Sequence, residues 1–237
     1  MAERADSPGD VDVAGDMATL QVLMAEHASL VSARSLAYNE AFTRAGMFLQ
    51  ALGMSFLGMS LLGAALGFTR DVLVIALVVV AFDVLIGIAT FRRVADTGRE
   101  DLWAMQAMNR IRNGYLRVAP GSAPFLTAGT FDDVPSVMQS YWFTEPSTST
   151  ALGNLAYGIS TSLGLVGMVL AVVSGVLASL VALAAGGTLQ AAVIVGIVTT
   201  VAVFALLAGW ALSAARGHQA AVSVRFPAPG SEARPDR

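Results

Sequence analysis

Four apolar stretches dominate the pattern of hydrophobic and polar positions along this chain. They cover residues 45–67, 72–91, 156–185 and 189–213, and Asp83 is the one charged residue inside them. A helix needs about 20 apolar residues to cross the hydrocarbon core of a bilayer, and a helix satisfies its own backbone groups there. The pattern therefore predicts an all-α fold, an integral membrane helical bundle with four transmembrane helices.

The connections between these stretches predict two hairpins. Only residues 68–71 separate the first two stretches, and Gly186 and Gly187 lie between the last two. Adjacent glycines are typical of a tight turn. We therefore expect a first transmembrane hairpin over 45–91, a cytoplasmic loop over 92–155 and a second transmembrane hairpin over 156–213.

Two further segments have helical periodicity without being uniformly apolar. The segment 17–44 predicts a cytoplasmic amphipathic helix that runs into the first span, and 101–118 predicts a second amphipathic helix inside the loop, as part of a small helical cap. Residues 1–16 contain five acidic side chains and 214–237 contain three prolines. We expect a disordered acidic tail at the first segment and a flexible cytoplasmic tail at the second.

The positions of arginine predict the orientation. Arg70 lies between the first two spans, whereas six arginines lie between the second and third: Arg92, Arg93, Arg99, Arg110, Arg112 and Arg117. By the positive-inside rule this loop and both termini are cytoplasmic. All 14 basic residues are arginine, a bias typical of GC-rich bacterial genomes, so the expected location is the bacterial inner membrane.

Composition narrows the function classes. The chain is 55% hydrophobic and 13% charged, against roughly 25% charged residues in soluble domains. Its net charge of −3 offers no basic patch for nucleic acid, and it has no cysteine and two histidines. No phosphate loop, dinucleotide fingerprint or HExxH motif occurs. We therefore expect a non-enzymatic protein with no catalytic, cofactor or metal residues, whose partners are the lipid bilayer and a second copy or another membrane subunit.

Small residues form a seam along the first span. A seven-residue spacing separates Gly46, Gly53, Ser60 and Gly67, and residues seven apart lie on nearly the same helix face. Such a face lets another helix approach closely. The seam can pack within the same chain or against a second subunit, and the sequence leaves both alternatives open.

The third span repeats this feature. Gly164 and Gly167 lie on a face of small residues that also contains Ser160, Ala171, Ser174 and Ala178. This face is suited to pack against the first span or to associate with another copy.

Asp83 is the most informative polar residue, because a carboxylate at membrane depth is costly unless it faces a protein interior. It lies about nine residues, or roughly 13 Å, from the arginines that follow the second span. Residues at a matching depth could bond it: Gln50, Ser55, Thr199 and Thr200. Asp83 is then either a protonated structural hydrogen-bond donor or a group that binds and releases a proton or cation.

These features predict a helix-association subunit or scaffold of a membrane assembly. The alternative is a small channel or proton-coupled transporter that uses Asp83.

Reporter fusions test the predicted orientation. Fusions at Ser7, Gly121 and Ser231 should report the cytoplasm, and a fusion at Thr69 should report the opposite side, because arginine accumulates between the second and third spans. Any other pattern contradicts the span assignment.

Overall fold

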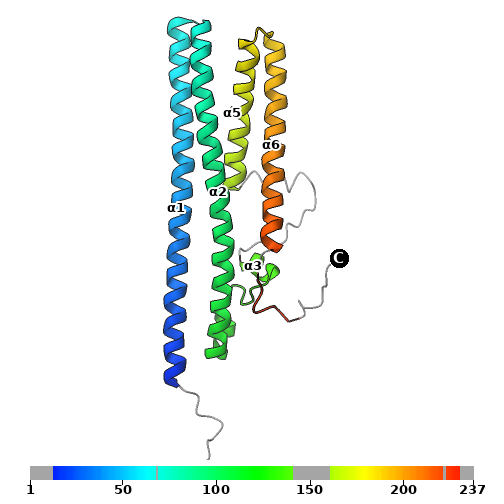
Figure 1. The fold of residues 1–237 in the computed structure, drawn as a ribbon. Coiled ribbons are helices and arrows are strands. Elements are labelled where there is room, and N and C mark those ends of the chain that lie inside the picture. The colour runs from blue at the N-terminus through cyan, green and yellow to red at the C-terminus, as the bar shows by residue number, and fades with distance from the viewer. Residues whose placement is uncertain (1–12, 68, 141–160, 221–222, 230–237) are drawn as a thin grey trace, which may run out of the picture. The chain divides into compact units, whose positions relative to one another are not determined.

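The fold is described by a computed structural model over residues 13–67, 69–140, 161–220 and 223–229 (Figure 1). Within these ranges all regular structure is helical. The elements are α1 (Val13–Leu66), α2 (Arg70–Val118), a 3₁₀ helix (Pro120–Phe125), α3 (Val134–Ser140), α5 (Ser162–Ala184) and α6 (Leu189–Ala220). Helices α1, α2, α5 and α6 are each long and apolar enough to cross a membrane. The predictions of an all-α fold and of four helices that could span a membrane are confirmed for the described residues.

Helix bounds differ from the sequence prediction in three places. Helix α2 continues through residues 92–100, where the end of the second span was expected, because this stretch has no proline and Arg99 pairs with Asp96 one turn before it. Helix α1 begins at Val13, inside the expected tail, and α6 ends at Ala220 instead of residue 213. The end of the apolar run thus marks a change in polarity within a continuous helix. The predicted start of the third span, 156–160, lies outside the described residues.

The chain forms two compact units. The cap unit is made by described residues within Met1–Leu36, Glu100–Glu145 and Val222–Arg237, and the span unit by those within Ala37–Arg99 and Pro146–Ala221. Each unit has its own apolar cluster. In the cap unit, Met105, Met108 and Val137 are buried, and Leu30 and Leu102 pack against them.

The core of the span unit joins all four of its helices. Phe91 of α2 and Val166 and Leu170 of α5 are buried together. Partly buried residues from the other helices complete this cluster, among them Ala45 of α1 and Leu207 of α6.

Glycines let these helices approach one another. A Cβ added at Gly87 of α2 would lie 2.8 Å from Leu170 Cδ1 and 3.0 Å from Phe48 Cζ, so its missing side chain admits residues of α5 and α1 together. Phe48 is fully buried there. At Gly167 of α5 an added Cβ would lie 3.1 Å from the Phe91 ring. The spans therefore pack where their side chains are smallest.

Helices α5 and α6 form the closest pair, as an antiparallel hairpin (Figure 1). Gly186, with a φ of 87°, makes the turn between them in a conformation that suits glycine. Gly175 of α5 faces Gly196 of α6, and Ser179 Oγ hydrogen-bonds to Ala192 O at 3.0 Å, which joins the two helices. Small residues thus bring the two backbones together, and a hydroxyl fixes their register.

An ion-pair cluster joins α1 to α2 beside the spans. Arg93 donates to Glu40 Oε2 at 2.7 Å, and Arg44 donates to Oε1 of the same side chain at 3.0 Å. The hydrogen bond from Arg93, and then that from Arg44, lowers the pKa of Glu40 below its ordinary value. Glu40 is therefore ionised at neutral pH and holds both arginines.

A glycine substitution tests the α5–α6 contact. An alanine Cβ at Gly175 would meet Thr200 Oγ1 and lie 2.6 Å from Gly196 O, so we expect Gly175→Ala to destabilise the protein by about 1–3 kcal/mol. At Gly209 an added Cβ meets no atom within 4 Å. Gly209→Ala, the matched control on α6, should melt at the wild-type temperature or slightly above it. Thermal unfolding of the purified protein in detergent measures both, and equal melting of the two variants would contradict the close approach.

Candidate functional site

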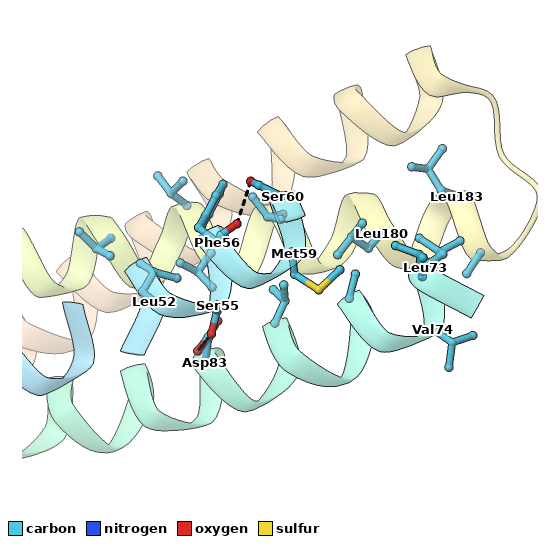
Figure 2. A pocket seen from close by; sticks show the side chains of 18 of the residues that line it. Leu52, Ser55, Phe56, Met59, Ser60, Leu73, Val74, Asp83, Leu180 and Leu183 are labelled. Carbon is cyan, nitrogen blue, oxygen red and sulfur yellow. Dashed lines mark hydrogen bonds between the residues drawn. The ribbon is translucent and has the colours of Figure 1, made fainter. Parts of the chain in front are cut away.

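Asp83 is buried in the span unit with half of its carboxyl group unsatisfied. Its side chain is 3% exposed. Ser55 of α1 donates a hydrogen bond to Asp83 Oδ1 at 3.1 Å. The second oxygen, Oδ2, is buried and has no hydrogen-bond partner among the described residues. Figure 2 shows the two side chains pointing toward one another from α1 and α2.

A cavity of about 900 Å³ lies beside this pair. Helices α1, α2 and α5 line it, and its walls are mostly aliphatic (Figure 2). Its polar lining consists of five residues: Ser55, Ser60, Thr69, Arg70 and Asp83. This volume falls in the range of about 300–1,000 Å³ that is typical of small-molecule sites in proteins.

The other polar residues of the lining provide neither a hydrogen bond to Asp83 Oδ2 nor a positive charge close to it. Ser60 donates to Phe56 O at 2.8 Å, within its own helix. Arg70 begins α2, thirteen residues before Asp83, which corresponds to about 20 Å along the helix axis. The α5 residues in the lining are all apolar. Asp83 is thus the acidic residue of a cavity whose one positively charged lining residue, Arg70, lies at the start of the same helix.

The structure selects one of the four expected partners of Asp83. Ser55 forms the hydrogen bond, whereas Gln50 is exposed on α1. Thr199 and Thr200 are half-buried on α6, which contributes no residue to the cavity lining, and Thr200 donates to Gly196 O at 2.9 Å in its own helix. The four candidate residues Asp83, Gln50, Thr199 and Thr200 therefore do not form one cluster.

The seam on the first span is open over most of its length. An added Cβ at Gly46 or Gly53 would meet no described atom within 4 Å, and Ser60 and Gly67 are exposed. The alternative in which this chain packs its own helix on the seam thus finds no neighbour at Gly46 and Gly53. In α5 the situation differs, because Gly167 contacts Phe91 and Gly164 is half-buried.

Two packing glycines, Gly175 and Gly196, were missed by the sequence analysis. Gly87, Gly175 and Gly196 each have a helix neighbour within van der Waals distance of an added Cβ. Gly87 follows Asp83 by four residues, so it shares the inward face that was expected for Asp83.

The cap unit buries a second carboxylate with full compensation. Asp132 Oδ1 accepts from Phe226 N at 2.7 Å, and Oδ2 accepts from Arg110 Nε at 2.7 Å and Arg225 N at 2.9 Å. Burial by itself would raise the pKa of Asp132, but the hydrogen bonds from Arg225, Arg110 and Phe226 hold it below its ordinary value. Asp133 adds a contact, since its Oδ2 accepts from Ala228 N at 2.7 Å. The segment 223–229 is therefore anchored to the cap unit.

A histidine in the cap unit serves packing. His27 Nδ1 lies 3.2 Å from the Tyr115 hydroxyl, which donates to Leu23 O at 3.2 Å. Burial, and then the positive charge of Arg112, lowers the pKa of His27. A neutral imidazole that donates from Nδ1 to the hydroxyl oxygen satisfies both groups, because the tyrosine has one proton to give.

In the described ranges no three His, Asp or Glu side chains gather at metal-binding distances. Comparison with protein-family models, curated proteins and solved structures finds no match. A carboxyl group with one free oxygen in an apolar cavity can accept or donate a hydrogen bond, or pair with a cation.

Spin labelling tests the charge network of the cap unit. The carboxylate of Asp132 stabilises the anchored segment above pH 3.8, its ordinary pKa, and this contribution is lost as the pH falls through its lower folded value. The chain has no cysteine, so Val224→Cys accepts a single label. We expect the label to become mobile in acid, and Asp132→Asn to make it mobile at neutral pH. Glu26→Gln, which changes an exposed acid on α1, is the control. An immobile label in Asp132→Asn at neutral pH would contradict the proposed anchor.

Proposed function

We propose that this protein is a non-enzymatic, multi-pass subunit of a membrane assembly, which acts through association of its helices. We further propose that it lies in the bacterial inner membrane with both termini in the cytoplasm, since six arginines lie between the second and third spans.

The open seam of α1 carries this proposal. Lipid-facing helices are usually covered by large aliphatic side chains, whereas small residues in a row are typical of helix interfaces. The described residues leave Gly46 and Gly53 uncovered. Elsewhere in the same unit, Gly87, Gly167 and Gly175 each receive a neighbouring side chain or helix. A second copy of the chain is the occupant we propose for the seam, because closed homo-oligomers are the commonest assemblies.

A second candidate function is a small channel or proton-coupled transporter that uses Asp83. One observation favours it: Asp83 Oδ2 is buried without a partner at the edge of a cavity. A purely structural carboxyl would be expected to satisfy both of its oxygens. The cavity wall argues against this candidate, because its residues are mostly aliphatic and provide no chain of polar groups for proton transfer beyond the five polar lining residues.

Photocrosslinking in native membranes tests the assembly. A crosslinking residue at Leu57, which is 62% exposed and lies one turn from Gly53, should form an adduct of twice the chain mass. The same residue at Val201 on α6 should react with lipid. Gly53→Leu should abolish the dimer adduct without lowering the melting temperature, since Gly53 has no neighbour within its own chain. Gly58→Leu, an equally open glycine about 140° around the helix, should leave the adduct unchanged. The absence of any dimer adduct at Leu57 would overturn the proposal.

A further inference from the structure

We propose that the cavity beside Asp83 binds a lipophilic organic cation, with the positively charged nitrogen or phosphorus centre of the ligand beside the Asp83 carboxyl group. The class includes aromatic and alkyl amines and quaternary onium compounds. The site lies within one chain, on α1, α2 and α5 of the span unit.

The walls of the cavity define the apolar part of the ligand. Aliphatic, aromatic and methionine side chains make up the rest of the lining, among them Leu52, Phe56, Met59, Val80, Val172 and Leu180. Several lining residues keep a large exposed fraction: Phe56 62%, Val74 53% and Val172 48%. The cavity is therefore not enclosed, and its lining residues lie on helices apolar enough to meet lipid. A ligand that enters there has to be soluble in the bilayer.

The free oxygen of Asp83 defines the charged part. Ser55 supplies one hydrogen bond, to Oδ1, and Oδ2 is buried with none. Charging this carboxyl group in an apolar layer is costly unless a positive charge lies beside it. The one arginine of the lining, Arg70, lies thirteen residues before Asp83, about 20 Å along the helix axis, so the compensating charge has to come from the ligand. A cation satisfies this requirement, whereas an anion would add a second unpaired charge.

An acyl chain is the simplest competing occupant, because it also fits an aliphatic cavity. It makes no use of the carboxyl group, and its binding would not depend on residue 83. This difference separates the two occupants in an experiment.

The inference goes beyond helix association and supplies a substrate class to the transport candidate. Cation binding without any coupled proton movement would uphold the inference and overturn that candidate. The Leu57 adduct reports on assembly alone, so each proposal can fail separately.

The test uses the full chain in detergent and two probes of matched shape, tetraphenylphosphonium and tetraphenylborate. Equilibrium dialysis should show saturable binding of the phosphonium to the wild type, and no saturable binding of the borate that depends on Asp83. Asp83→Asn should weaken phosphonium binding at least tenfold. Asp71→Asn makes the same charge change on an exposed residue of α2 outside the cavity, and should bind as the wild type does.

A second variant decides the question if Asp83→Asn does not fold. Val80→Phe adds bulk to the lining three residues before Asp83 and keeps the carboxyl group, so it should also weaken phosphonium binding at least tenfold. Wild-type affinity in a folded Asp83→Asn or Val80→Phe would overturn the inference. Equal saturable binding of both probes would overturn it as well, and would point to an apolar occupant such as an acyl chain.

Discussion

Close approach of helix backbones is the constraint on which the span unit depends. Within a bilayer, lipid is as apolar as leucine, so helices gain little from hiding apolar surface and associate through tight packing. At Gly87, α2 meets both α1 and α5, because Phe48 and Leu170 enter the space of the missing side chain. The α5–α6 pair meets in the same way at Gly175 and Gly196. On α2, α5 and α6, glycines therefore lie on the faces that turn inward.

Two of the buried carboxyl groups, those of Asp132 and Asp83, are satisfied in opposite ways. Asp132 is fully buried and receives three donors, the guanidinium group of Arg110 and the backbone N–H groups of Arg225 and Phe226. Asp83 is nearly as buried and receives one donor, from a serine. A buried charge is tolerated when it is paired and hydrogen-bonded, and is costly otherwise. The first arrangement holds structure together, whereas the second leaves interaction capacity for a ligand or a proton.

The length and polarity of the spans were predictable because bilayer thickness sets them, and the Gly186 turn because a positive φ favours glycine. The rotation of each helix was harder to predict. Depth alone placed Gln50, Thr199 and Thr200 beside Asp83, but a residue at the right depth can face any direction. On α1 the face with Phe48 and Ser55 turns inward, and the more regular glycine seam does not.

The course of α2 after Phe91 also escaped the sequence pattern. Arginines that end an apolar run signal the edge of the membrane, yet they form helix as readily as leucine does. Periodicity predicted a separate amphipathic helix over 101–118. In the structure this helix is the continuation of α2, which runs through Gly98 without a break although glycine is a weak helix former. The end of an apolar run therefore does not have to coincide with the end of a helix.

The anchored segment 223–229 has a consequence for how the chain matures. Asp132 obtains two of its three donors from Arg225 and Phe226, which follow α6. A ribosome makes these residues after every membrane helix. During synthesis, Asp132 therefore lacks these two backbone donors until about ninety more residues have been added. Contacts between residues this far apart in the sequence form slowly. Asp132 can gain its full set of donors only after α6 has been made, so this anchor marks a chain that already contains α6.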